Sequence, residues 1–188
     1  MGIDRIAAER ALGAFLEALG LPEEARAELG GTPARVVEAY ATDLLSGYAV
    51  DVAALLAAET SSVTTTARPG VVVLRDAALA TLCPHHLLPG LGHATIAYRP
   101  GARLVGIGTL ARVLDAYSRR LTLQETIGER VARALVEHAG ARSALCRIEL
   151  SHSCLSARGA RQPGATVVSV ATAGDDDPAL STLAGGAA

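Results

Sequence analysis

The sequence predicts an α+β protein in which the strands pair largely antiparallel. Residues up to about position 50 show helical patterns, and β-type runs separated by Gly and Pro begin near residue 71. One helical block over residues 110–137 separates the third of these runs from the fourth. This order differs from the repeated strand–helix alternation of a parallel sheet. The β-type runs cover residues 71–74, 94–98, 104–107, 143–150 and 166–171.

An N-terminal helical segment, residues 1–50, contains two helix patterns. In the first, apolar residues recur at the i, i+3, i+4 and i+7 positions of one face, and the pattern ends near Gly20 and Pro22. The second pattern begins at Thr32-Pro33, because Thr is a favourable N-cap and Pro suits the first helical position. The apolar stripe of the first helix consists of Leu12, Phe15, Leu16 and Leu19.

The main domain is expected over residues 51–174, followed by a tail over residues 175–188. The tail contains Asp175-Asp176-Asp177 and ends in a Gly- and Ala-rich stretch, so we expect a disordered, solvated segment and assign it no function. Residues 60–66 are rich in Thr and Ser, and we expect a loop or an exposed strand there.

The composition argues against several classes of partner. With 17 basic and 19 acidic residues the net charge is −2, which gives neither nucleic acid nor an anionic membrane a general electrostatic reason to bind. No run approaches the roughly 18 apolar residues of a membrane span, and the N-terminus lacks the apolar centre of a secretory signal, so a cytoplasmic protein is expected. Aromatic residues make up 3% of the chain, and the resulting core of small aliphatic side chains favours oligomerisation.

Two clusters of cysteine and histidine indicate a metal site. In Cys83-Pro84-His85-His86, a thiolate and an imidazole lie three positions apart, so one tight turn can direct both at a single ion. In His152-Ser153-Cys154, residues 152 and 154 share one face at the end of a predicted strand. Three protein ligands with a fourth position left for water are typical of catalytic zinc. The five candidate ligands would then leave one or two histidines free for proton transfer.

Each cluster taken alone is also compatible with simple packing, because Cys is among the most buried residue types. Cys146 lies in an apolar strand, and we interpret it as a core residue. His138 lies near a helix C-terminus and His93 in a strand, and we interpret neither as part of a site. Three cysteines without an export signal argue against a disulfide framework.

Three segments of the chain resemble successive signatures of the GTP cyclohydrolase I family, in the family's order and approximate spacing. The similarity extends from about Gly31 to about Gly174. It implies the tunnelling fold (T-fold), in which an antiparallel sheet carries two helices on one face. It also implies a homodecamer of two pentamers with active sites at subunit interfaces. The segments are Cys83-Pro84-His85-His86-Leu87-Leu88-Pro89, Arg119-Arg120-Leu121-Thr122-Leu123-Gln124-Glu125 and His152-Ser153-Cys154-Leu155-Ser156-Ala157-Arg158-Gly159.

The resemblance further implies that residues 51–174 form a catalytic domain that opens the imidazole ring of a guanine-type purine. Zinc would lower the pKa of a bound water, which attacks C8, and a histidine would protonate the leaving nitrogen. A carboxylate would accept hydrogen bonds from the guanine ring N–H and amino group. The residues with implied roles are Cys83, His86 and Cys154 as zinc ligands, His85 and His152 as proton-transfer groups, Gln124 and Glu125 at the pyrimidine edge, and Arg35, Arg112 and Arg158 at the triphosphate.

The chain departs from the family at residues expected to bind the triphosphate. The family usually has Gly-Leu-Ser-Lys-x-x-Arg, whereas this chain has Gly106-Ile107-Gly108-Thr109-Leu110-Ala111-Arg112, so the Ser and the Lys are both absent. All 17 basic residues are Arg, and a retained positive charge would be expected as Arg rather than Thr109. The Glu that usually follows the first Cys ligand is replaced by Pro84.

The sequence leaves three functions open. The first is the family reaction, from GTP to formate and 7,8-dihydroneopterin triphosphate. The second is the same zinc-dependent ring opening on a purine without a triphosphate, such as a nucleoside, guanine, 8-oxoguanine or uric acid, as Gly108-Thr109 suggests. The third is a non-catalytic purine-binding or regulatory homologue, against which the retained His85 and His152 argue.

Overall fold

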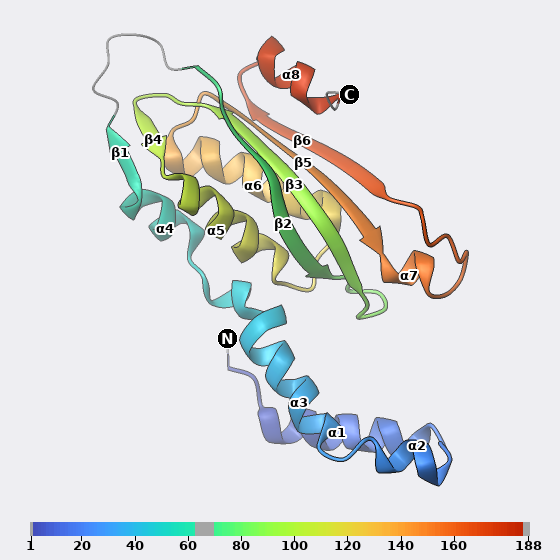
Figure 1. The fold of residues 1–188 in the computed structure, drawn as a ribbon. Helices are drawn as coiled ribbons and strands as arrows, with labels where there is room; N and C mark the ends of the chain where they lie inside the picture. The colour runs from blue at the N-terminus through green and yellow to red at the C-terminus, as the bar shows by residue number, and fades with distance from the viewer. Residues whose placement is uncertain (1, 63–69, 186–188) are drawn as a thin grey trace.

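The computed structural model of the protein describes residues 2–62 and 70–185. Its centre is a four-stranded antiparallel sheet in the order β2-β3-β5-β6, with α5 and α6 on one face (Figure 1). The predicted α+β class, with two helices on one face of an antiparallel sheet, is confirmed. These elements are β2 (Val72–Leu82), β3 (Pro89–Arg99), α5 (Ile107–Ser118), α6 (Gln124–Ala139), β5 (Ser143–His152) and β6 (Val167–Gly174).

The main core lies between the sheet and these two helices. Ile96 of β3 and Ile148 of β5 are fully buried in one cluster with Val113 of α5 and Ile127 of α6. Cys146 in β5 belongs to the same cluster, and burial raises the pKa of its thiol to about 12. Cys146 is therefore an uncharged core residue, as the sequence predicted.

The strands extend beyond the apolar runs that predicted them. β2 and β3 have 11 residues each and form a hairpin whose register pairs Leu82 with Pro89. β4 (Arg103–Val105) is shorter than the predicted run, because Ile107 already begins α5. β4 pairs with β1 (Thr60–Ser62) in a separate two-stranded sheet, and residues 63–66 lie outside the described residues.

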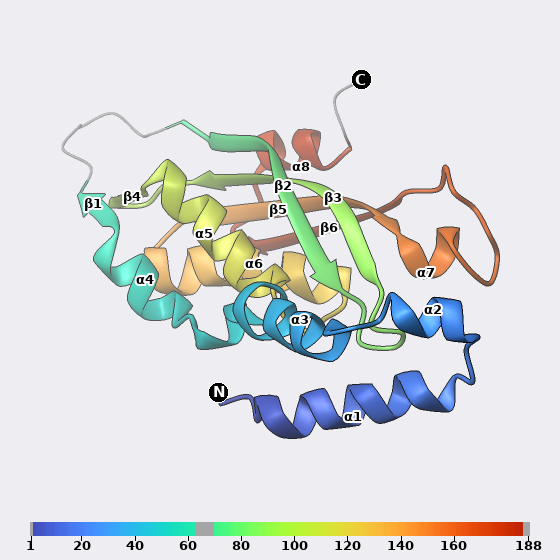
Figure 2. The same cartoon turned by 60° about the horizontal axis from the view of Figure 1, so that its bottom comes forward.

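The N-terminal helices α1 (Arg5–Ala18), α2 (Glu23–Ala27) and α3 (Thr32–Ala39) extend away from the sheet (Figures 1 and 2). The apolar stripe predicted on the first helix is only partly covered, since no residue of α1 is buried and Phe15 is 58% exposed. The N-cap of α3 is Gly31 in the left-handed conformation (φ 72°), one residue before the expected Thr32.

Short helical elements connect this arm to the sheet: a π-helical turn (Tyr40–Leu44), a 3-10 turn (Ser46–Ala49) and α4 (Val52–Ala58). Asp51 caps α4 by accepting a hydrogen bond from the backbone N–H of Ala54 at 3.0 Å. Among the described residues, no helix is both long and apolar enough to cross a membrane.

The tail that we expected to be disordered over residues 175–188 forms a helix, α8 (Pro178–Ala184), in its described part. Leu180 is only 3% exposed because it packs against Ala97 and Leu145. These two residues face away from α5 and α6, so α8 covers part of the opposite side of the sheet (Figure 2). The expectation of a disordered tail was wrong, because Leu180 packs against the sheet and the acidic run contains one buried carboxylate, that of Asp177.

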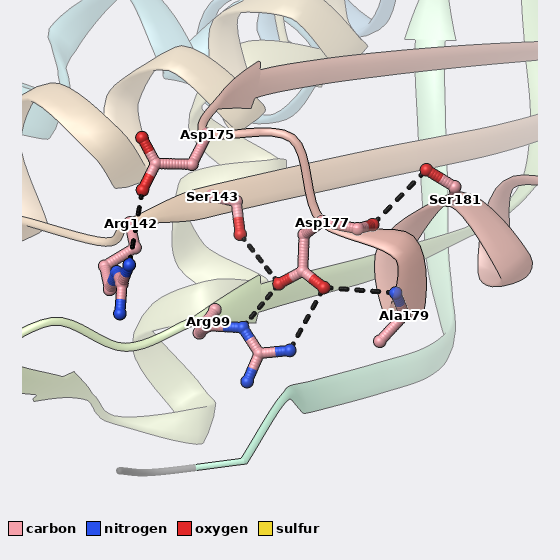
Figure 3. Close-up of polar contacts among 7 residues, drawn as sticks. All are labelled: Arg99, Arg142, Ser143, Asp175, Asp177, Ala179 and Ser181. Atoms are coloured by element: carbon pink, nitrogen blue, oxygen red, sulfur yellow. Dashed lines mark hydrogen bonds and ion pairs between the residues drawn. The ribbon is translucent and has the colours of Figure 1, made fainter.

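That buried carboxylate, Asp177, fastens α8 to the sheet (Figure 3). It accepts hydrogen bonds from the Arg99 guanidinium (Nη2 to Oδ1, 3.0 Å), from Ser143 Oγ (3.1 Å) and from the backbone N–H of Ala179 (3.1 Å). The hydrogen bond from Arg99 is the main reason why the pKa of Asp177 falls from its usual 3.8 to about 2.

Replacing Asp177 by Asn is expected to lower the melting temperature at neutral pH by several degrees, because the charge-assisted hydrogen bonds are lost. Since the folded pKa lies below the unfolded value, the carboxylate stabilises the fold fully above about pH 4, and this contribution disappears as the pH falls towards 2. The melting temperatures of the unchanged protein and of Asp177→Asn, measured between pH 7 and pH 2, should therefore converge as the pH approaches 2. Asp176→Asn, at an exposed neighbour, is the control; an equal effect of both variants would contradict the assignment.

Candidate metal centre and active site

The turn between β2 and β3 carries two of the predicted metal ligands. The backbone carbonyl of Cys83 accepts a hydrogen bond from the N–H of Leu87 at 2.9 Å, and the N–H of Cys83 donates to the carbonyl of Leu88 at 3.0 Å. Leu87 closes the turn in the left-handed conformation, with a φ of 54°. This closed turn brings the side chains of Cys83 and His86 to one place.

The third predicted ligand, Cys154, lies in α7 (Ser153–Ser156). The register pairs Gly90 with His152, so the end of β5 lies beside the β2–β3 turn. We predicted that His152 and Cys154 share a strand face, and this is wrong: β5 ends at His152, and Cys154 lies in the helical turn that follows. The turn directs Cys154 towards Cys83 and His86, and the ligand atoms of all three lie within 4.8 Å of one another.

This Cys–His–Cys group (Cys83, His86 and Cys154) has the chemistry of a metal site. Thiolate and imidazole are the preferred ligands of zinc, and three of them leave a coordination position open. Both cysteines are half-buried and His86 is exposed, so solvent reaches the group. The group could therefore hold a metal ion to which water or a substrate has access.

His152 is held beside this group by Gln124, the first residue of α6. Gln124 is 3% exposed, and its amide Nε2 donates to the backbone carbonyls of Ile148 (3.0 Å) and Val167 (2.9 Å). With both amide hydrogens used, Oε1 can only accept, so Nε2 of His152, 2.8 Å away, must be the donor. The neutral imidazole thus carries its hydrogen on Nε2 and leaves Nδ1 available as an acceptor.

Gly90 leaves room for this imidazole. A Cβ at position 90 would lie 3.2 Å from Nδ1 of His152 and 3.3 Å from its Cε1, closer than ordinary van der Waals contact. The ring therefore lies directly over the backbone of β3. We did not identify Gly90 from the sequence, although a glycine inside a strand often marks such a close approach.

Three further residues with expected roles are exposed: His85 for proton transfer, Glu125 at the pyrimidine edge and Arg158 at the triphosphate. The His85 ring lies 6.4 Å from that of His86, edge to face. Glu125, at the start of α6, borders a hollow of about 310 Å³ that Glu129 and β6 residues also line. Arg158 lies in the segment after α7.

Two other arginines expected at a triphosphate already have partners in the chain. Arg35 donates from Nη1 to the Gly30 carbonyl (2.9 Å) and from Nη2 to Thr32 Oγ1 (3.0 Å), at the start of α3. Arg112 of α5 forms an ion pair with Glu59, a residue that no sequence pattern had indicated.

Arg112 and the Cys–His–Cys group lie at opposite ends of the sheet. Val105, just before α5, donates its N–H to the Tyr98 hydroxyl at 2.9 Å. Along β3, Tyr98 lies eight residues from Gly90, the partner of His152, which is about 26 Å at the usual rise per residue. Figure 1 shows α5 beginning beside β4, far from the β2–β3 turn and α7. One copy of the chain does not bring Arg112 to the Cys–His–Cys group.

A larger hollow, of about 390 Å³, lies at the Arg99 end of the sheet. Four of its five charged side chains form ion pairs, Arg99 with Asp177 and Arg142 with Asp175 (Figure 3), and the fifth is Asp176. No thiol or imidazole lines it. The Cys–His–Cys group is therefore the better candidate for the active site.

Three side chains that could bind a metal ion and leave one position open, close in the chain to a histidine of fixed orientation, are the arrangement expected of a metal-dependent hydrolase. Comparison with known protein families identifies the family within this class. The family model described as GTP cyclohydrolase I matches residues 8–182 of this chain. The chain therefore belongs to the GTP cyclohydrolase I family, whose fold is the T-fold, and it is an enzyme with a GTP cyclohydrolase I-like function. The match also includes most of α8.

Individual relatives agree with the family model. The GTP cyclohydrolase 1 of Leifsonia xyli subsp. xyli is 37% identical over 174 residues, which are 93% of this chain and 89% of that protein. The GTP cyclohydrolase 1 of Chromobacterium violaceum is 41% identical over 172 residues, 92% of this chain and 81% of that protein. Among solved structures, the apo form of the archaeosine synthase QueF-Like covers 58% of this chain and 98% of its own, with a TM-score of 0.47 and 16% identity.

Proposed function

We propose that this chain converts GTP to formate and 7,8-dihydroneopterin triphosphate, with zinc bound by Cys83, His86 and Cys154. The observation that carries the proposal is the convergence of these three ligands within 4.8 Å in a member of the GTP cyclohydrolase I family. The relatives are named GTP cyclohydrolase 1, which supports GTP over a purine without a triphosphate and over a non-catalytic role.

A zinc ion held there would act as a Lewis acid and make a water nucleophilic enough to attack C8 near neutral pH. His152 supplies the proton transfer that ring opening needs. With its Nε2–H bound to Gln124, it accepts a proton at Nδ1 and returns it to the purine nitrogen as the C8–N bond breaks. His85, exposed beside the ligand His86, is the second proton-transfer group that we assign.

Glu125 is assigned to the guanine ring, because an exposed carboxylate can accept hydrogen bonds from the ring N–H and the amino group together. We also expected Gln124 to contact this edge. Its amide hydrogens are used within the chain, so a contact with the ring would have to use the second lone pair of Oε1. Its main proposed role is therefore to orient His152.

Arg35, Arg112 and Arg158 are assigned to the triphosphate. Since Arg112 lies at the other end of the sheet from the Cys–His–Cys group, the proposed site is completed by Arg112 of a second copy. We propose a homodecamer of two pentamers, as the family resemblance implies, with its active sites between copies. Light scattering of the zinc-loaded protein measures this assembly.

Three free cysteines, two of them in the Cys–His–Cys group, support a reducing compartment, and we infer that the enzyme acts in the cytoplasm.

The proposed reaction is tested by offering GTP, guanosine, guanine, 8-oxoguanine and uric acid in parallel to the zinc-loaded protein. Ultraviolet spectra and mass spectrometry detect ring opening, formate and the pterin product. Consumption of GTP alone, with release of formate, supports the proposal. The proposal is overturned if GTP is not converted while an unphosphorylated purine is, or if none of the five compounds is converted.

A further inference from the structure

The N-terminal part of α5 holds a carboxylate from another part of the chain. Glu59, the C-cap residue of α4, accepts a hydrogen bond at Oε2 from Thr109 Oγ1 at 2.7 Å. Its other oxygen, Oε1, forms the ion pair with Arg112 Nη1. The backbone N–H of Gly106 also donates to the carbonyl of Glu59, at 3.4 Å. Glu59 therefore occupies both polar side chains that this part of α5 offers to an anion.

The two partners differ in how easily they can release Glu59. Thr109 is 3% exposed, so its hydroxyl has little freedom to turn elsewhere. The Arg112 side chain is 60% exposed and the Glu59 side chain 40%, so their ion pair can open into solvent. The hydrogen bond from Thr109 and the ion pair with Arg112 both lower the pKa of Glu59, which is therefore fully ionised at neutral pH.

We propose that Glu59 is a specificity-determining residue, whose carboxylate competes with the substrate triphosphate for Arg112. The inference rests on the proposed function, in which Arg112 contacts the triphosphate. A phosphate that approaches Arg112 must displace the carboxylate or accept a like charge beside it, and either event weakens binding. Position 109 carries a neutral Thr where the family usually has Lys. Of residues 106–112, Arg112 alone is positively charged, so it meets the negative charge of the phosphate as well as that of Glu59.

Glu59→Gln removes the charge and keeps the size of the side chain and its capacity to accept from Thr109. The expected result is a KM for GTP about three- to tenfold lower, with little change in kcat. Binding of inorganic tripolyphosphate to the zinc-loaded protein, measured by calorimetry, should become tighter by the same factor. Glu137→Gln is the matched control, because Glu137 pairs with Arg133 at 3.9 Å on the surface of α6 and should change neither quantity.

A second background shows whether Glu59 acts through Arg112. In Arg112→Gln, adding Glu59→Gln should give little further gain in tripolyphosphate affinity, since the competed cation is gone. Equal or weaker tripolyphosphate binding by Glu59→Gln, or an undiminished gain in the Arg112→Gln background, would overturn the inference. Tripolyphosphate binding does not depend on turnover. Tighter binding by Glu59→Gln therefore supports the competition even if GTP is not converted, an outcome that would refute only the proposed reaction.

Discussion

Cys154→Ser is expected to lose bound zinc and at least most of the ring-opening activity. The variant removes one of the three proposed ligands, whose ligand atoms lie within 4.8 Å of one another, and a serine hydroxyl is a poor zinc ligand at neutral pH. Metal assistance contributes several kcal/mol to such reactions, so the rate should fall on the order of 10³-fold. Elemental analysis of the purified protein and the GTP assay measure the two losses.

Cys146→Ala provides the control for this experiment, because Cys146 is the third cysteine and is fully buried in the core. It should keep its zinc and lose only a little thermal stability through the small cavity. Cys154→Ser protein that retains one zinc per chain and full activity would refute the assignment of Cys154 as a ligand.

His152→Ala is expected to retain zinc and the fold but to lower kcat by about 10²- to 10⁴-fold, the usual contribution of a positioned proton-transfer group. The imidazole lies beside the Cys–His–Cys group with one nitrogen bound to Gln124, which leaves Nδ1 as the group that can exchange protons. His93→Ala serves as the control, because His93 is exposed on the same sheet. A variant without His152 that turns over GTP at the normal rate would remove this residue from the mechanism.

A second variant changes Gln124, the residue that orients His152, and a smaller loss of activity is expected. Gln124→Leu keeps the approximate volume but removes the acceptor that fixes the ring, and a loss of about 10- to 100-fold in kcat is expected, as for other residues that orient functional groups. The nitrogen chemical shifts of the His152 imidazole, measured by NMR, should show the hydrogen on Nε2 in the normal protein and a mixture in the variant. An unchanged tautomer would leave Gln124 without this role.

The two Cys/His clusters could be found in the sequence because each is short and local, but the choice of Cys83, His86 and Cys154 among the five candidates came from the family resemblance. A turn of four residues places Cys83 and His86 together, and only the direction of Cys154 needed the structure. The fold class followed from the order of strand and helix patterns, whereas the T-fold needed the family resemblance.

Contacts between distant parts of the chain could not be predicted in this way. Glu59 lies 50 residues before Thr109 and 53 residues before Arg112 in the sequence. The residues around Glu59 show no periodicity or motif that predicts these two contacts. Asp177 was misjudged for the same reason, since its partner Arg99 comes from β3. The carbonyls that bind the Gln124 amide belong to the backbone, and a sequence does not show which backbone carbonyls need a side-chain partner.

The placement of Arg112 and the Cys–His–Cys group at opposite ends of the sheet has a genetic consequence. In the proposed shared arrangement each polypeptide serves two reaction centres, one with its thiolates and one with its guanidinium. A chain inactivated by a mutation in its Cys–His–Cys group would still supply a functional Arg112 to another centre, and a chain mutated at Arg112 would still supply its Cys–His–Cys group. Mixed rings formed from two differently inactivated alleles would therefore contain some intact centres, and the two alleles would complement each other when expressed in one cell.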